Sequence, residues 1–170
     1  MAHAAAIRPA TPDDAEEIAR LHVAAWHETY PGLLPAAEIA RHDVSDRRAL
    51  WSRALSEGQR VALCPGAGFA QVAPQRELAM AARGFPVELW CLYTLATVHG
   101  TGLGRHLFRA ALAMAPPGAF TCCVLVGNAR ALRFYAGLGA ERVETREDHV
   151  GHTGVTEHVL GWSEAARARI

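Results

Sequence analysis

Apolar positions along the chain follow two periods, and each period predicts one kind of element. Residues three or four apart, such as Ile18, Leu21 and Ala25, predict the buried side of a helix. Short apolar runs bounded by Gly or Pro predict strands. The strands predicted in this way cover residues 7–9, 61–64, 69–72, 87–95, 120–126, 141–150 and 155–161.

Capping and breaking residues mark where the predicted helices begin and end. Thr11, followed by Pro12 and two acidic residues, is typical of a helix N-terminus. One helix ends at the Pro pair 116–117, and another begins at Asn128 and ends near residues 137–139. Helices therefore alternate with strands, and this order predicts an α/β fold with a mixed central β-sheet flanked by helices.

The pattern is less regular in three places. A helical stretch from about 36 to 55 lacks a clear pattern in its middle, and residues 73–85 match no element. The last nine residues, 162–170, are expected to form a loose tail. The run at 87–95, in contrast, is apolar except for Glu88, which is typical of a strand covered on both faces. We therefore place this strand at the centre of the sheet.

Length and composition predict one folded domain. The chain has 170 residues, of which 51% are hydrophobic and 20% charged. We expect the domain to span residues 1–170, with its core at about 5–161. Seventeen acidic residues balance 17 basic ones, all of them Arg. Because nucleic-acid binding depends on neutralising phosphates, this balance predicts no nucleic-acid partner.

The sequence also bears on location and metals. The longest apolar stretch, residues 89–98, is about half the length that a membrane-spanning helix needs. The first ten residues lack the basic and apolar regions of a signal peptide, so we expect a cytoplasmic protein with no membrane partner. The four Cys residues lack zinc-like spacing, and His149, His152 and His158 fall on a predicted hairpin with alternating faces. We expect no metal site and no disulfide.

A glycine-rich segment, His99-Gly-Thr-Gly-Leu-Gly104, follows the predicted central strand and precedes a helix. Backbone N–H groups at the start of such a helix bind phosphate. A nucleotide-binding P-loop is excluded because it requires Lys, and these glycines do not match the spacing of the dinucleotide pattern G-x-G-x-x-G. The loop therefore binds a phosphate of another compound or forms only a tight turn.

This loop resembles the [Q/R]-x-x-G-x-[G/A] acyl-CoA signature of the GCN5-related N-acetyltransferase (GNAT) family, with His99 in place of Gln or Arg. Other segments resemble motifs of the same family in the same order. They are the opening strand and helix at 7–14, W-x-x-x-Y-x-G-L at 26–33, the third strand at 68–70, E-[IL]-x-x-L-Y-V at 88–94, and N-x-x-A-x-x-F-Y-x-x-L-G-F at 128–140. The resemblance covers most of the chain and implies a single-domain GNAT fold that binds acetyl-CoA.

The resemblance implies where acetyl-CoA would bind. The strand that contains Glu88 would separate from its neighbour, and the backbone of Leu92 and Thr94 would pair with the pantetheine arm, with the Leu92 N–H near the acetyl carbonyl. Arg105 and Arg109 could meet the phosphates, although both also suit an ordinary exposed helix face. The implied cofactor-binding residues are Leu92, Thr94, His99, Gly100, Thr101, Gly102, Leu103, Gly104, Arg105 and Asn128.

Two residues are candidates for acid–base catalysis. Attack of an amine on a thioester needs a base for the ammonium proton and an acid for the departing thiolate. Glu88 is the expected base, because burial in an apolar strand raises the pKa of a carboxyl group; a solvent-edge carboxylate is the alternative. Tyr135 lies two helical turns after Asn128 on the same face, and the resemblance implies that it is the acid. A Tyr that only packs is the alternative.

The acceptor side is implied at Trp26, Glu28 and Tyr30, since aromatic rings with a carboxylate suit an amine cation. Core packing explains the Trp and Tyr almost as well. We expect an N-acetyltransferase that moves an acetyl group directly to a primary amine of a small molecule or peptide, in a ternary complex. The alternatives are a non-catalytic acyl-CoA-binding module and a transferase for a longer acyl group. The residues do not identify the amine, and homodimers are common in folds of this type.

Overall fold

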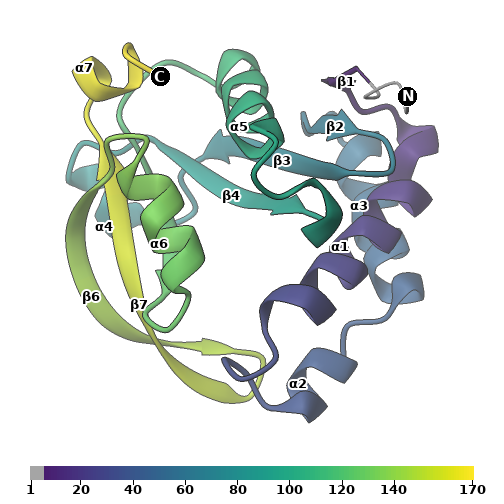
Figure 1. Ribbon diagram of the computed structural model, residues 1–170. Coiled ribbons are helices and arrows are strands. Elements are labelled where there is room, and N and C mark those ends of the chain that lie inside the picture. Colours follow the sequence, from purple (N-terminus) through teal and green to yellow (C-terminus); the bar gives the residue numbers. More distant parts are fainter. Residues whose placement is uncertain (1–5) are drawn as a thin grey trace.

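A mixed seven-stranded sheet runs through the molecule, with its strands in the order β1-β2-β3-β4-β5-β7-β6 (Figure 1). The computed structural model describes residues 6–170, so Ala5, the expected start of the core, lies outside the described residues. Neighbouring strands are antiparallel except β4 and β5, which are parallel. The predicted mixed sheet is thus confirmed. The strands are β1 Arg8–Pro9, β2 Ala62–Cys64, β3 Gly68–Pro74, β4 Val87–Thr94, β5 Phe120–Leu125, β6 Glu141–Val150 and β7 Thr153–Trp162.

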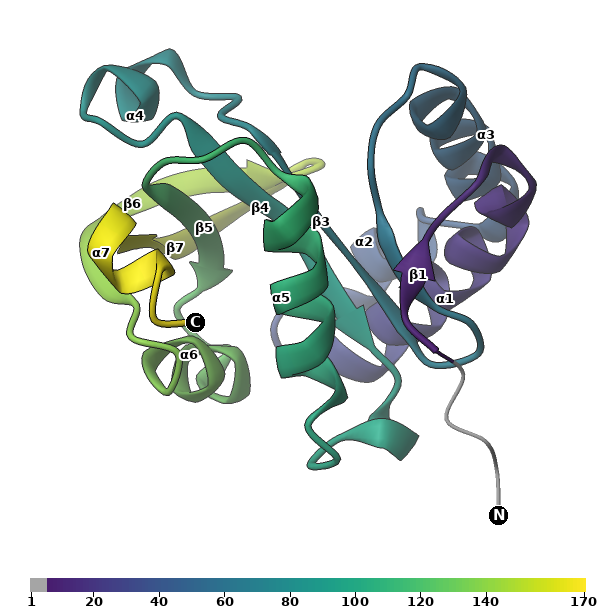
Figure 2. The ribbon, with the colours of Figure 1, turned by 90° about the horizontal axis from the view of Figure 1, so that it is seen from above.

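Helices cover both faces of this sheet (Figure 2). Successive residues of a strand point to opposite faces, and β2 shows the result. Ala62 packs in a core cluster with residues of α5 and α6, whereas Leu63 packs in a second cluster with α1 and α3. The helices are α1 Ala15–Thr29, α2 Ala36–Ala40, α3 Val44–Ser56, α4 Leu78–Ala82, α5 Leu103–Met114, α6 Ala129–Ala136 and α7 Glu164–Arg167, with short 3-10 turns at Pro12–Asp14 and Ala96–Val98.

The sheet opens between its two parallel strands. Only two residue pairs join β4 to β5, Val87 with Phe120 and Glu88 with Thr121. Beyond them β4 continues to Thr94 and β5 to Leu125, and α5 and α6 lie on the same side of this opening (Figures 1 and 2). The opening exposes backbone groups that a closed sheet would pair internally.

Two stretches without a clear pattern have local explanations. The helical stretch at 36–55 is two helices, α2 and α3, because the Asp43 side chain accepts the Asp46 N–H (2.8 Å) and so begins a new helix. Residues 73–85 contain the end of β3 and the five-residue helix α4. Neither stretch has the apolar spacing of a longer element.

The C-terminal residues are packed, so the expectation of a loose tail from residue 162 was wrong. Trp162 ends β7, is 1% exposed and stacks on Phe120, with ring centroids 4.5 Å apart. Its indole N–H donates to the Leu138 carbonyl (2.9 Å). Arg167 of α7 donates to the carbonyls of Leu112, Pro116 and Gly118, at the end of α5 and in the loop that follows it.

We predict that Trp162→Ala lowers the free energy of unfolding by about 3–5 kcal/mol, the range for truncating a buried Trp. Urea unfolding followed by circular dichroism measures the change. Leu78→Ala is the control, because Leu78 is 86% exposed and its truncation should change stability by less than about 0.5 kcal/mol. Equal effects of the two substitutions would contradict the packed C-terminus.

A buried histidine of α1 packs against the central strand β4. His22 of α1 is 7% exposed, stacks on Tyr93 of β4 (5.0 Å between ring centroids), and its Nδ1 accepts the Trp51 indole N–H (3.1 Å). An accepting Nδ1 requires the neutral ring. Burial, with smaller effects of Arg47 and His42, lowers the pKa of His22 to about 3.

This buried ring should make the fold sensitive to mild acid. Below about pH 6.5 the unfolded chain binds a proton at His22, whereas the folded chain keeps this ring neutral down to about pH 3. The contribution of His22 to the free energy of unfolding is therefore fully present above about pH 6.5 and decreases as the pH falls towards 3. We predict a loss of roughly 1 kcal/mol per pH unit over this window, which His22→Gln removes. The measurement is urea unfolding between pH 4 and 8. His27→Gln, an exposed change on the same helix, should retain the wild-type slope.

Candidate active site

A cavity of about 720 Å³ occupies the opening between β4 and β5. Its wall comes from α1, β4, the loop before α5, β5, α6 and β7, segments that are far apart in the sequence. Four of the predicted site residues do not line the cavity, namely Glu28, Glu88, Thr101 and Leu103. The predicted residues that do line it are Trp26, Tyr30, Leu92, Thr94, His99, Gly100, Gly102, Gly104, Arg105, Asn128 and Tyr135.

The backbone of β4 is turned towards the cavity at alternate residues. The Leu95 N–H donates to the Ala67 carbonyl (2.9 Å), and Thr94 lies opposite Gly68 in the same register. In an antiparallel ladder, residue pairs that exchange backbone hydrogen bonds alternate with pairs that do not. Because Leu95 is bonded to β3, Thr94 and Leu92 belong to the pairs without such bonds, and their N–H and C=O groups point away from β3. Among residues 6–170, no strand pairs with this edge of β4 beyond Glu88.

A bulge in β4 sets this register. Val72 lies opposite Leu89 and Gln71 lies opposite Cys91, so Trp90 is an extra residue on the β4 side. A bulge of this kind shifts every following residue by one position. The extra residue therefore determines which β4 groups meet the cavity.

Two glycines shape the loop between β4 and α5. Gly100 and Gly102 have φ values of +78° and +87°, a region that other residues rarely adopt. Gly102 caps α5, whose first N–H groups lack partners within the helix. Thr101 does not line the cavity; its hydroxyl donates to the Val98 carbonyl (2.7 Å) and holds the turn. Leu103 packs against the core beneath α5.

Side chains of this loop and of α6 meet at His99. Its Nε2 lies 3.2 Å from the Thr94 carbonyl and, because a carbonyl only accepts, Nε2 donates the hydrogen bond. The Arg130 guanidinium of α6 contacts both ring nitrogens of His99, and Arg130 lines the cavity together with Arg105. Sequence reasoning missed Arg130, which fills an unspecified position of the N-x-x-A motif. Arg109 donates to the Ile170 carbonyl and is not a cavity residue.

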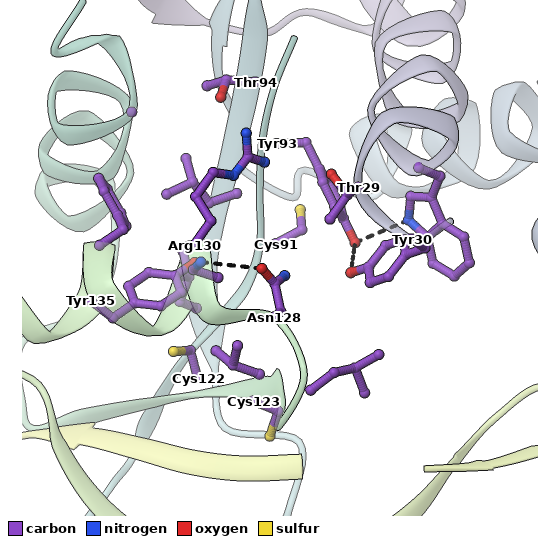
Figure 3. Close-up of a pocket in the computed structure, with 18 of the residues that line it drawn as sticks. Thr29, Tyr30, Cys91, Tyr93, Thr94, Cys122, Cys123, Asn128, Arg130 and Tyr135 are labelled. Carbon is purple, nitrogen blue, oxygen red and sulfur yellow. Dashed lines mark hydrogen bonds between the residues drawn. The ribbon is translucent and has the colours of Figure 1, made fainter. Parts of the chain in front are cut away.

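Helix α6 brings two predicted residues to one side of the cavity (Figure 3). Asn128 caps the helix, since its Oδ1 accepts the Ala131 N–H (3.2 Å), and Tyr135 follows two turns later. Tyr135 is 8% exposed, and burial raises its pKa well above the ordinary value, so its hydroxyl stays protonated. Within the described part of the chain, that hydroxyl has no hydrogen-bond partner. It is therefore able to donate to a bound group.

Glu88 does not have the environment expected of a general base. Both carboxylate oxygens accept from Arg76, at 2.6 Å from Nη2 and 3.0 Å from Nε, and the Arg76 backbone N–H adds a third contact (3.3 Å). Its side chain is buried at the point where β4 and β5 still pair, outside the cavity wall. Glu88 therefore closes an ion pair at the base of the opening, and its expected role as base does not fit this geometry.

Three aromatic side chains form the opposite side of the cavity (Figure 3). The Trp26 indole N–H donates to the Tyr93 hydroxyl (3.0 Å), and the Tyr30 hydroxyl lies 3.4 Å from the same oxygen. Tyr93 was not among the predicted site residues, although its alternate position in β4 could have indicated it. Glu28 is displaced from this group, because its carboxylate accepts the Ala96 N–H (2.7 Å).

The cysteines of the cavity are poor nucleophiles. Burial raises the pKa of Cys91 and of Cys123 to about 12, and it raises that of Cys122 well above the ordinary value for a thiol. Their thiols therefore stay protonated near neutral pH. Within residues 6–170, no group of three or more His, Cys, Asp or Glu side chains is placed to hold a metal ion. No helix in that range is both long and apolar enough to span a membrane.

Known proteins are similar to this chain. A curated relative, the uncharacterized N-acetyltransferase YuaI of Bacillus subtilis, is 24% identical in an alignment of 163 residues that covers 93% of this chain and 92% of YuaI. The structure of yncA from Salmonella typhimurium with its cofactor acetyl-CoA is 17% identical, with a TM-score of 0.65 over 94% of this chain and 93% of yncA.

The PaiA N-acetyltransferase of Thermoplasma acidophilum, in complex with coenzyme A, is 15% identical, with a TM-score of 0.64 over 93% of this chain and 99% of PaiA. At these identities the two solved structures show a shared fold. The family model described as acetyltransferase (GNAT) family matches residues 15–140, most of the chain. With the open parallel strands, the glycine-rich loop and this match, the chain belongs to the GNAT acetyltransferase family.

Proposed function

We propose that this acyltransferase uses acetyl-CoA as its donor and transfers the acetyl group directly to a primary amine bound in the same cavity. The observation that carries the proposal is the opening between β4 and β5, where the backbone of Leu92 and Thr94 is turned towards the cavity. A linear chain with amide groups can lie there as if it were the missing strand. The pantetheine arm of CoA is such a chain.

The loop before α5 fits the phosphates of the donor. The first N–H groups of α5 and its dipole favour an anion there. Arg105 and Arg130 line the same end of the cavity and add positive charge. Two structures of the same fold were solved with acetyl-CoA or CoA, which supports the same class of donor for this chain.

Tyr135 is the proposed acid. When the C–S bond breaks, the sulfur of CoA leaves as a thiolate and needs a proton. Tyr135 lies on the cavity wall with a protonated hydroxyl that has no partner among the described residues. The raised pKa values of Cys91 and Cys123 support direct transfer over an acyl-cysteine intermediate, since neither thiol is ionised near neutral pH.

The aromatic side of the cavity is the proposed acceptor region. Trp26, Tyr30 and Tyr93 present ring faces and hydroxyl oxygens, which attract a cation and accept hydrogen bonds from an ammonium group. Trp26 and Tyr30 are thus proposed as acceptor residues, as the sequence indicated, whereas the Glu28 carboxylate is occupied elsewhere.

We predict that acetyl-CoA stabilises the protein against thermal unfolding, by about 2.7 kcal/mol at one hundred times its Kd, and that NAD and ATP do not. Arg130→Ala should weaken acetyl-CoA binding about tenfold, because one phosphate contact is lost. Arg133→Ala is the control, since Arg133 lies on the same helix, exposed and outside the cavity wall. No shift with millimolar acetyl-CoA would contradict the proposed donor.

We predict that Tyr135→Phe lowers kcat with the best amine of a panel by about 10²-fold or more, because the leaving thiolate loses its acid. The Kd for acetyl-CoA should stay within about twofold, since the ring and its packing remain. Release of CoA thiol measures kcat, and calorimetry measures Kd. A variant with unchanged kcat would remove the assigned role from Tyr135.

A further inference from the structure

One carboxylate lies on the wall of the cavity. Glu157 of β7 is 8% exposed and lies opposite Leu125 of β5, beyond the point where β5 has left β4. Among the described residues that line the cavity, the other charged side chains are the cations Arg76, Arg105 and Arg130. Glu157 is therefore the only acidic group there to meet an ammonium ion.

The ion pair of Glu157 with Arg146 uses one of its two carboxylate oxygens. Arg146 of β6 donates from Nε (2.9 Å) and reaches from Nη2 (2.8 Å), and both contacts go to Oε1 of Glu157. The same guanidinium donates to Glu77 (2.6 Å) and lies 3.7 Å from Glu144. One cation thus pairs with three carboxylates, and the Cys123 thiol of β5 is a further hydrogen-bond partner of Glu157.

This arrangement differs from that of Glu88. The two oxygens of Glu88 both accept from Arg76, which has no second carboxylate among its ion pairs in the described chain. Glu88 is also outside the cavity wall, whereas Glu157 is part of it. An amine in the cavity therefore meets the carboxylate of Glu157 and not that of Glu88, whose two oxygens accept from a guanidinium.

The surroundings of Glu157 suit a proton acceptor. Burial raises the pKa of Glu157 above its ordinary value and Asp148 of β6 adds to the rise, whereas the charge and hydrogen bond of Arg146 and the hydrogen bond of the Cys123 thiol act in the opposite direction. The thiol of Cys123 on β5 stays protonated beside it, and Glu77 shares the charge of Arg146. Glu157 is thereby less acidic than an exposed carboxyl group, which favours proton uptake from an ammonium ion.

We propose that Glu157 is the general base of the reaction and the residue that selects a cationic amine as acceptor, an inference that rests on the proposed acetyl transfer. The ammonium group binds at the carboxylate of Glu157, which lines the same cavity as Trp26 and Tyr30. An acceptor of this class is a primary amine that is protonated in solution, and a neutral alcohol or amide of the same size is a poor substrate.

The transfer balances with Glu157 and Tyr135 as partners. Glu157 takes one proton from R-NH₃⁺, and the neutral nitrogen forms the new C–N bond with the acetyl carbon. As the C–S bond breaks, the thiolate takes the Tyr135 proton, and the second nitrogen proton returns to the Tyr135 oxygen. The products are the amide, CoA thiol and one proton, which Glu157 releases to water.

The test compares the pH dependence of kcat/KM in three proteins, with the best amine of the panel as the probe. We expect Glu157→Gln to lower kcat/KM at neutral pH by about 10²-fold or more and to remove the fall in rate on the acid side. Glu157→Asp should keep that acid-side fall at a reduced rate. Glu144→Gln removes a carboxylate from the same guanidinium outside the cavity wall and should keep the wild-type profile.

Acetyl-CoA binding separates this inference from the function that it rests on. Glu157→Gln is expected to bind acetyl-CoA with the wild-type Kd, because Gln retains an oxygen for Arg146, and this also shows that the variant folds. A wild-type pH profile in Glu157→Gln would overturn the role of Glu157 while leaving acetyl transfer in place. Binding of acetyl-CoA by wild type without turnover of any amine would overturn both.

Discussion

The site depends on the early separation of two parallel strands. Because β4 and β5 share only two residue pairs, the sheet has an unpaired edge in its interior, a state that most folds avoid. The β4 bulge then turns the backbone of Leu92 and Thr94 towards this edge. The glycine-rich loop, α6 and β7 are placed around the opening that results. Packing of α5 and α6 across the opening holds the two halves of the sheet together.

Local pattern accounts for the parts of the fold that the sequence predicts well. Gly and Pro bound the predicted strands, and Asn128 forms the helix cap that its side chain suits. The predicted site residues that line the cavity are mostly backbone positions and aromatic rings, such as Leu92, Thr94 and Tyr135, whose location follows from strand and helix periodicity. The C-terminus was misjudged because Trp162 is fixed by stacking on Phe120, more than forty residues earlier.

Charged side chains were harder to place than apolar ones. Glu28 and Glu88 both fall within the motifs that resemble the family. However, the Glu28 carboxylate accepts a backbone N–H from another segment, and the Glu88 carboxylate accepts hydrogen bonds from the Arg76 guanidinium. Glu157 occupies a position in a strand of mixed polarity, and nothing local marks it. Its partners, Arg146 and Cys123, come from two other strands. Hydrogen bonds between distant segments decide what a carboxylate does, and a single sequence does not display them.

Although the chain has a formal net charge of zero, the charged side chains that line its cavity are distributed unevenly. Arg105 and Arg130 contribute positive charge to the cavity from α5 and α6, whereas Glu157 contributes a carboxylate from β7. In the proposed reaction, these opposite charges attract an anionic donor and a cationic acceptor to different walls of one cavity. Added salt screens both attractions.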